Sequence, residues 1–133
     1  MKIAIFGCGF VGGTVANYLE EHNTEVVRVD PKLYPDTDGI QAVLDSDGII
    51  ICVPTPMGED GSCDDSMILQ VLSLCDYRTK ILIKSTVTPD LLQNYDANIV
   101  YNPEFLREAH AKEDFDKQHT FILGHHDNNK VDA

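Results

Sequence analysis

The sequence predicts a Rossmann-type α/β fold, in which a doubly wound parallel sheet of about six strands forms a single domain. Short apolar runs alternate with helical or turn-rich segments, and this alternation is typical of parallel strands joined by right-handed crossovers. The runs "GIIICV" and "KILIK" are apolar on both faces, as strands are when helices cover both sides of a sheet. The expected strands are Lys2–Phe6, Val26–Asp30, Gly48–Val53, Lys80–Lys84, Asn98–Tyr101 and Thr120–Leu123.

The segments between these strands predict helices of unequal length. Apolar residues recur at helical spacing between positions 11 and 19 and again between positions 68 and 75. The other two crossovers predict only a short helix near Ile40–Leu44 and scarcely two turns from Pro89. We therefore expect one domain over residues 1–124, followed by a polar tail over residues 125–133.

Composition excludes several classes of partner. The chain of 133 residues has 22 acidic and 10 basic residues, and its net charge of -12 argues against binding to nucleic acid or anionic membranes. No apolar run approaches the roughly 20 residues of a membrane span. A strand pattern begins at Lys2, which leaves no room for a signal peptide, so we expect a cytoplasmic protein.

The cysteines and histidines predict neither disulfides nor a metal site. The four cysteines are widely spaced and form no C-x-x-C pair, so reduced thiols are expected. The pair His125 and His126 lacks a Cys or carboxylate at the usual ligand spacing, and no metal is expected. The cysteines are Cys8, Cys52, Cys63 and Cys75.

A glycine-rich turn follows the first strand. Gly7, Gly9 and Gly12 fit the pattern G-x-G-x-x-G, in which the first glycine makes a tight turn and the third lets helix and strand pack closely. The second glycine lets a pyrophosphate approach the backbone. Free amides at the helix start, at Phe10 and Val11, are expected to bind the phosphates, which requires no basic residue.

Asp30 adds a second element of a dinucleotide site. It ends the second predicted strand, where its carboxylate can accept hydrogen bonds from the ribose hydroxyls of adenosine. Its charge disfavours a 2′-phosphate and favours NAD over NADP, although Lys32 and Arg28 lie near enough to soften this preference. Alternatively, the glycines only end a strand and Asp30 caps the next segment. FAD and other adenosine ligands are bound by similar loops.

Three later stretches give the sequence a family resemblance: "VPTP" at Val53–Pro56, "KSTVTP" at Lys84–Pro89 and "YNPEFLREAHAKEDF" at Tyr101–Phe115. The chain resembles the N-terminal NAD-binding domain of the UDP-glucose/GDP-mannose dehydrogenase family, most closely the UDP-glucose 6-dehydrogenases, from Met1 to about Gly124. The resemblance implies NAD as cofactor and a UDP-sugar or related nucleotide sugar as substrate. It also implies oxidation of the sugar C6 alcohol to a carboxylate with two NAD.

The resemblance implies roles for residues at the ends of the later strands. Val53, Thr55, Ser85 and Thr86 would border the cofactor. Thr86 would contact the nicotinamide side and help to order a water, and Glu104 would manage protons while a covalent intermediate is hydrolysed. The sugar-nucleotide site would be lined by Glu104, Phe105, Leu106 and Glu108.

Each of these residues has a purely structural alternative. Thr55 and Thr86 could satisfy backbone groups at strand ends. Glu104 could cap a helix, because an acidic side chain in a first turn offsets the helix dipole. Phe105 and Leu106 could be ordinary core residues.

The sequence departs from the family pattern in three respects. It contains no Gly-Gly-x-Cys-x-x-Lys-Asp string, which carries the nucleophilic cysteine of the family, and no long central helix of the kind used for dimerisation. The segment between Asp30 and Ser46 is also short. We expect either a dehydrogenase domain, completed by a homo-oligomer or a catalytic half in trans, or a stand-alone module that binds NAD or a sugar nucleotide without turnover. A remnant that binds nothing is a third hypothesis.

Overall fold

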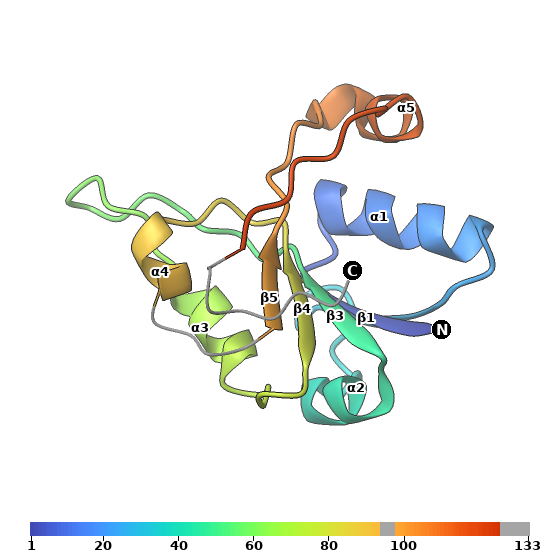
Figure 1. Ribbon diagram of the computed structural model, residues 1–133, viewed down its shortest axis with the longest axis horizontal. Helices are drawn as coiled ribbons and strands as arrows, with labels where there is room; N and C mark the ends of the chain where they lie inside the picture. The colour runs from blue at the N-terminus through green and yellow to red at the C-terminus, as the bar shows by residue number, and fades with distance from the viewer. Residues whose placement is uncertain (94–97, 126–133) are drawn as a thin grey trace.

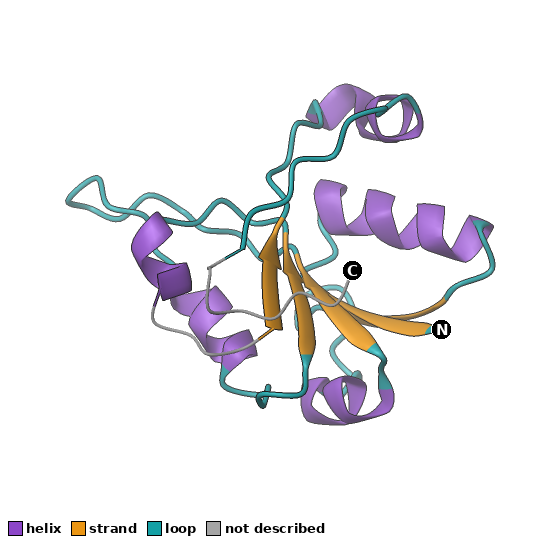
Figure 2. Ribbon diagram, viewed as in Figure 1, coloured by secondary structure: helices purple, strands orange, loops and turns teal. Residues whose placement is uncertain are grey.

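A computed structural model describes residues 1–93 and 98–125 and contains one parallel sheet (Figures 1 and 2). The strand order is β2-β1-β3-β4-β5, and every neighbouring pair is parallel. This arrangement confirms the predicted α/β fold class. The strands are β1 (Lys2–Phe6), β2 (Glu25–Val29), β3 (Gly48–Ile51), β4 (Lys80–Ile83) and β5 (Asn98–Tyr101).

Helices cover both faces of the sheet. Helices α1 and α5 lie on one side, and α2, α3 and α4 lie on the other (Figure 1). In α1, a twelve-residue helix, the apolar stripe predicted from the sequence packs on the sheet through Val15 and Ala16. The helices are α1 (Phe10–Glu21), α2 (Gly39–Asp45), α3 (Ser66–Leu72), α4 (Pro89–Gln93), the 3₁₀ turn η1 (Glu108–His110) and α5 (Ala111–Asp116).

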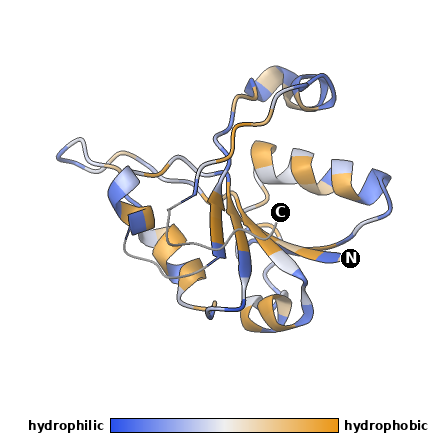
Figure 3. Cartoon of the chain, viewed as in Figure 1, coloured by the Kyte–Doolittle hydropathy of each residue, from blue (hydrophilic) through white to orange (hydrophobic). Residues whose placement is uncertain are grey.

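The central strands β1, β3 and β4 consist mostly of apolar residues (Figure 3), and each face of the sheet has its own helical cover. Ala4 and Phe6 of β1 belong to the larger cluster, which includes the apolar residues of α2, α3 and α4. Ile5 lies in the smaller cluster with Val15, and Phe115 of α5 packs against that cluster. This two-sided burial is the physical basis of the continuous apolar runs in the sequence.

The sixth expected strand, Thr120–Leu123, is not formed. Its apolar side chains have no buried face, since Phe121 is 63% exposed and Leu123 is 62% exposed. Only the next residue pairs with the sheet: Gly124 makes an antiparallel bridge with Tyr101, with N···O distances of 2.6 and 2.7 Å. The return from α5 thus touches the end of β5 at one residue and does not extend the sheet.

The strand order places a crevice at the carboxyl edge of the sheet. Strand β2 lies on one side of β1, and β3 lies on the other side. The connections that leave β1 and enter β3 therefore run in opposite directions along the sheet, and a crevice opens between β1 and β3. Ligands of open α/β sheets bind at this type of switch point. Of the expected tail, only His125 is described, and residues 126–133 lie outside the described part. No helix in residues 1–93 or 98–125 is long and apolar enough to cross a membrane.

Candidate functional site

The turn after β1 requires glycine at two positions. Gly7 has a φ of +85°, and a Cβ there would lie 2.7 Å from the carbonyl oxygen of Cys52 and the nitrogen of Val53. A Cβ on Gly12 would lie 1.8 Å from the carbonyl oxygen of Gly7. The first turn of α1 therefore lies directly against the backbone that follows β1, as the glycine spacing predicts.

Gly9 differs from these two residues because space is open around it. It is the N-cap of α1, its φ is -67°, and a Cβ there would meet nothing within 4 Å. The first helical hydrogen bond runs from the Gly13 amide to the Gly9 carbonyl. Within the described residues, the amides of Phe10 and Val11 have no acceptor. Open space beside free helix-start amides is the geometry that binds anions such as phosphate.

Asp30 follows β2 and accepts three backbone hydrogen bonds. Its Oδ2 accepts from the Cys8 amide at 2.9 Å, and its Oδ1 accepts from the amides of Lys32 at 3.0 Å and Leu33 at 3.2 Å. Burial alone would raise the pKa of Asp30, but these hydrogen bonds outweigh it and lower the pKa below its ordinary value. The carboxylate is therefore ionised at neutral pH.

The two basic residues near Asp30 differ in their contacts. Arg28 Nη2 donates to Asn17 Oδ1 and to Glu20 Oε2, both at 2.8 Å, so its charge is already paired on α1. Lys32 is exposed, and its side chain makes no ion pair in the described part of the chain. Of the two, Lys32 is thus the residue left to soften the predicted preference for NAD.

The hydroxyl residues that follow β3 and β4 fall into two groups. Ser85 is buried, and its Oγ donates to the Val53 carbonyl at 2.7 Å, so it satisfies a backbone group at a strand end. Thr86 is exposed and Thr55 is half-buried, and neither hydroxyl has a partner among residues 1–93 and 98–125. Satisfying a backbone group at a strand end, the structural alternative for Thr55 and Thr86, is therefore the role of the Ser85 hydroxyl and not of the two threonine hydroxyls.

A buried polar cluster connects the ends of β4 and β5. The Lys84 side chain is only 4% exposed, and its Nζ donates to Asn102 Oδ1 at 2.6 Å. Nζ also lies 3.2 Å from Glu104 Oε2, an ion pair without hydrogen-bond geometry. Asn102 Nδ2 in turn donates to the Ile122 carbonyl at 2.8 Å, which holds the returning chain.

Glu104 closes a turn rather than capping a helix. Its Oε1 accepts from the amides of Phe105 at 2.7 Å and Leu106 at 2.8 Å, while the next helical turn begins only at Glu108. Its Oε2 is buried, accepts no hydrogen bond from the described residues, and faces the Lys84 ammonium at 3.2 Å. Phe105 is 63% exposed, which excludes a core role for it.

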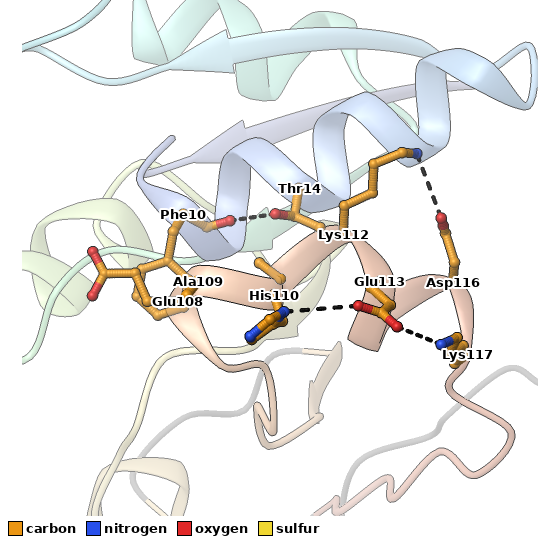
Figure 4. Close-up of a pocket in the computed structure, with 10 residues that line it drawn as sticks. Phe10, Thr14, Glu108, Ala109, His110, Lys112, Glu113, Asp116 and Lys117 are labelled. Carbon is orange, nitrogen blue, oxygen red and sulfur yellow. Dashed lines mark hydrogen bonds and ion pairs between the residues drawn. The ribbon is translucent and has the colours of Figure 1, made fainter.

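A cavity of about 630 Å³ lies between the first turn of α1 and the η1–α5 segment (Figure 4). It is lined by Phe10, predicted at the cofactor, and by Glu108, predicted at the sugar nucleotide. Small-molecule pockets commonly have volumes of 300–1,000 Å³. A smaller cavity of about 270 Å³ is lined by Phe105 and Leu106. The structure therefore brings Phe10, predicted to bind the cofactor, and Glu108, predicted to bind the substrate, together in the larger cavity. Two other predicted substrate residues, Phe105 and Leu106, line the smaller cavity.

Comparison with known proteins decides the family. The sequence profile of the UDP-glucose/GDP-mannose dehydrogenase family, NAD binding domain, matches residues 31–133. The chain belongs to this family. It spans the NAD-binding domain of these dehydrogenases, as the glycine turn and the "NPEFL" stretch predict.

Curated relatives include dehydrogenases of two nucleotide sugars. The GDP-mannose 6-dehydrogenase of Pseudomonas aeruginosa is 28% identical, and the match covers 93% of this chain and 41% of that protein. The UDP-glucose 6-dehydrogenase AglM of Haloferax volcanii is 26% identical, with the same coverage of 93% and 41%. An uncharacterised protein of Methanocaldococcus jannaschii, MJ1054, is 32% identical over 93% of the chain and 18% of its own length. The chain thus spans about two fifths of the dehydrogenases it matches.

Solved structures show the same fold. A crystal structure of a ternary complex of GDP-mannose dehydrogenase from Pseudomonas aeruginosa superposes with a TM-score of 0.85 at 27% identity, over 96% of this chain and 41% of that one. A UDP-glucose dehydrogenase from Pyrobaculum islandicum gives a TM-score of 0.81 at 22% identity, over 92% and 40% of the two chains. The sequence match to the Pseudomonas aeruginosa enzyme extends over 177 residues, more than the 133 of this chain, so that relative has segments that this family member lacks.

Three of the four thiols of this family member are poorly suited to nucleophilic attack. Burial raises the pKa of Cys52 to about 12 and that of Cys75 to about 11. Burial and the nearby Asp30 carboxylate also raise the pKa of Cys8. These three thiols stay protonated at neutral pH, and the thiolate is the reactive form. Among the described residues, no group of three His, Cys, Asp or Glu side chains could hold a metal ion.

Two residues of the site were not predicted from the sequence. Lys84 and Asn102 lie in the stretches that carry the family resemblance, but only the structure shows that both are buried and hydrogen-bonded to each other. A signal for Lys84 was present, because a charged residue directly after an apolar, two-sided strand must be paired if it is buried. The Cys8 amide was also missed as a partner of Asp30.

Proposed function

We propose that NAD binds in the crevice at the carboxyl edge of the sheet, through specific residues of this chain. The pyrophosphate would accept hydrogen bonds from the amides of Phe10 and Val11, and the adenosine ribose would donate to Asp30. The observation that carries this assignment is the contrast within the glycine turn: Gly9 faces open space, whereas Gly12 is packed against the Gly7 carbonyl.

The nicotinamide end would lie toward β3 and β4. Val53 and Thr55 follow β3, while Ser85 and Thr86 follow β4, so all four lie at the edge where the glycine turn begins. The unpaired hydroxyls of Thr55 and Thr86 support contacts with the cofactor, and the exposed position of Thr86 suits contact with a water. Ser85 would act through its backbone, since its hydroxyl is used internally.

For the protein to which this domain belongs, we propose oxidation of a nucleotide sugar at C6 from the alcohol to the carboxylate. NAD bound in the crevice would accept a hydride from C6 in each of two successive oxidations, and water would supply the second carboxylate oxygen. Glu104 Oε2 accepts no hydrogen bond from the described residues and lies 3.2 Å from Lys84 Nζ, and its free lone pair supports a role in accepting a proton from that water. Phe105, Leu106 and Glu108 would line the sugar-nucleotide site, and the relatives support a GDP- or UDP-linked sugar.

The nucleophile for a covalent intermediate would come from a second domain or a partner chain. Cys8, Cys52 and Cys75 have raised pKa values, and the fourth thiol, Cys63, donates to the Thr86 carbonyl at 3.8 Å and has no basic partner among the described residues. The same observation favours the second candidate function, in which this chain alone binds NAD or a sugar nucleotide without turnover. A cytoplasmic location and an oligomer that completes the site stay predictions.

Titration of the purified chain with NAD and NADH tests the proposal. We expect saturable binding that Gly9→Val abolishes, because its side chain would fill the space left for the pyrophosphate. Gly13→Ala is the matched control: its Cβ would only touch the Cys8 carbonyl oxygen at 3.4 Å, so binding should be retained. Titrations that do not saturate, or equal affinities for wild type and Gly9→Val, would contradict the assignment.

A second measurement separates the two candidate functions. The chain is mixed with NAD and either GDP-mannose or UDP-glucose, and formation of NADH is followed by absorbance. We expect no steady production of NADH from this chain alone. Steady turnover would show that one of its own groups replaces the nucleophile and would reject the binding-only function.

A further inference from the structure

Asp30 contacts the glycine-rich turn as well as the position proposed for the ribose. Its Oδ2 accepts the Cys8 amide at 2.9 Å, and Cys8 lies between Gly7 and Gly9. The hydrogen bond joins residues 22 positions apart in the sequence and connects the end of β2 to the turn after β1. A side chain proposed to bind the ligand thus also holds the backbone that surrounds the ligand.

We propose that Asp30 is a positioning residue for the phosphate-binding turn, in addition to its role as a ribose acceptor. The expected effect of Asp30 on ligand affinity rests on the proposed function. Its hydrogen bond to the turn is a property of the free protein. Two consecutive amides of the turn are tied to the end of β2: Gly7 donates to the Val29 carbonyl at 2.9 Å, and Cys8 donates to the Asp30 carboxylate. The turn is therefore fixed before a ligand arrives, which reduces the entropy lost on binding.

The carboxylate has capacity for both tasks. Its two oxygens offer about four acceptor positions in total. The amides of Lys32 and Leu33 occupy Oδ1, and the Cys8 amide occupies one position on Oδ2. One position on Oδ2 is left for a ribose hydroxyl, so the ligand can bind without breaking the hydrogen bond to the turn.

Amide hydrogen exchange of the free protein tests the structural part. In Asp30→Ala, we expect the Cys8 amide to exchange about tenfold faster than in wild type, as the loss of a hydrogen bond to a charged group predicts. The Gly7 amide is an internal control, because its acceptor is the Val29 carbonyl and is unchanged. If the ratio of the Cys8 and Gly7 exchange rates is the same in both proteins, the proposal is overturned.

Binding of 2′,3′-dideoxy-ADP tests the consequence for the ligand. This probe keeps the pyrophosphate but lacks the ribose hydroxyls, so a residue that acts only on the ribose cannot affect it. Asp30→Ala and Asp30→Asn have the same charge, but only Asp30→Asn keeps an acceptor oxygen. The Cys8 exchange rate in Asp30→Asn shows whether this oxygen faces the Cys8 amide or the amides of Lys32 and Leu33. We expect Asp30→Ala to bind the probe about fivefold more weakly than Asp30→Asn does. Equal affinities of the two variants, with the Cys8 amide protected in Asp30→Asn, would reject the positioning role.

Asp38→Ala is the matched control for charge and stability. Asp38 is an exposed carboxylate that also accepts two backbone amides, those of Ile40 at 2.9 Å and Gln41 at 3.3 Å, at the start of α2. Its removal should leave both the Cys8 exchange rate and the binding of the probe within twofold of wild type. If wild type binds neither ADP nor the probe, the proposed function fails, whereas the exchange experiment still decides whether Asp30 holds the turn.

Discussion

The two ends of the crevice are built by different means. At the phosphate end, Gly7 and Gly12 let the backbone of the turn approach β3 and α1, and the groups offered to a ligand are backbone amides. At the other end, the approach of β4 and the "NPEFL" segment is fixed by buried side chains, with Lys84 placed between Asn102 and Glu104. The first end depends on the absence of side chains, whereas the second depends on their mutual pairing.

The largest expected effect comes from removing the charge at the paired end. Lys84→Met leaves the Glu104 carboxylate, which is 15% exposed, without its cation in a buried setting. Breaking a buried ion pair on one side typically costs about 3–5 kcal/mol, and we expect the free energy of unfolding to fall by about that amount. Urea denaturation followed by circular dichroism measures it.

Two further variants show whether pairing is the cause. Lys84→Met combined with Glu104→Gln removes both charges and should recover part of the loss, because an unpaired buried charge no longer exists. Lys112→Met is the surface control: Lys112 is 64% exposed and pairs with Glu21 and Asp116 in solvent. An equal loss in Lys84→Met and in the double variant would show that packing rather than charge links the two strands.

At the phosphate end, stability and binding should depend on different residues. A side chain at Gly12 should lower the stability, and a side chain at Gly9 should weaken NAD binding. Gly12→Ala places a Cβ 1.8 Å from the Gly7 carbonyl oxygen, so α1 must shift, and overpacking of this kind costs about 1–3 kcal/mol. Gly9→Ala meets nothing within 4 Å and should leave the unfolding midpoint unchanged. Its effect should be confined to weaker NAD binding. A destabilised Gly9→Ala variant would remove the distinction between the two residues.

The same contrast explains what the sequence could predict. Glycine spacing is local, and a strand followed by Gly7, Gly9 and Gly12 indicates both the turn and its use. Lys84 and Asn102 are 18 residues apart and directly follow the neighbouring strands β4 and β5, and no spacing rule pairs two such residues. Their cluster became visible only when β4 and β5 were placed side by side.

Strands and helices show a similar division. Strands β3 and β4 were predictable because helices cover both faces of the sheet and leave continuous apolar runs. Thr120–Leu123 has an equally apolar run but no cover, which composition alone does not reveal. Helix α5 lies in a charged stretch with little apolar periodicity. Phe115, which packs edge to face on Tyr18 of α1 with ring centroids 4.9 Å apart, attaches it to the domain.

The smallest expected effect lies at Ser85, between the two ends. Its hydroxyl donates to the Val53 carbonyl at 2.7 Å, so Ser85→Ala leaves a carbonyl at a strand end without this donor. The free energy of unfolding should fall by about 1 kcal/mol, and the affinity for NAD should stay the same. Denaturation and NAD titration on the same preparation measure both quantities.

Thr86→Ala provides the comparison for Ser85, because its exposed hydroxyl has no partner among the described residues. We expect its stability to match wild type and its NAD affinity to fall, the reverse of Ser85→Ala. If Ser85→Ala loses affinity at unchanged stability, the serine hydroxyl turns toward the cofactor on binding. The Ser85 side chain, and not only its backbone, would then contact the cofactor at the end of β4, in the middle of the crevice.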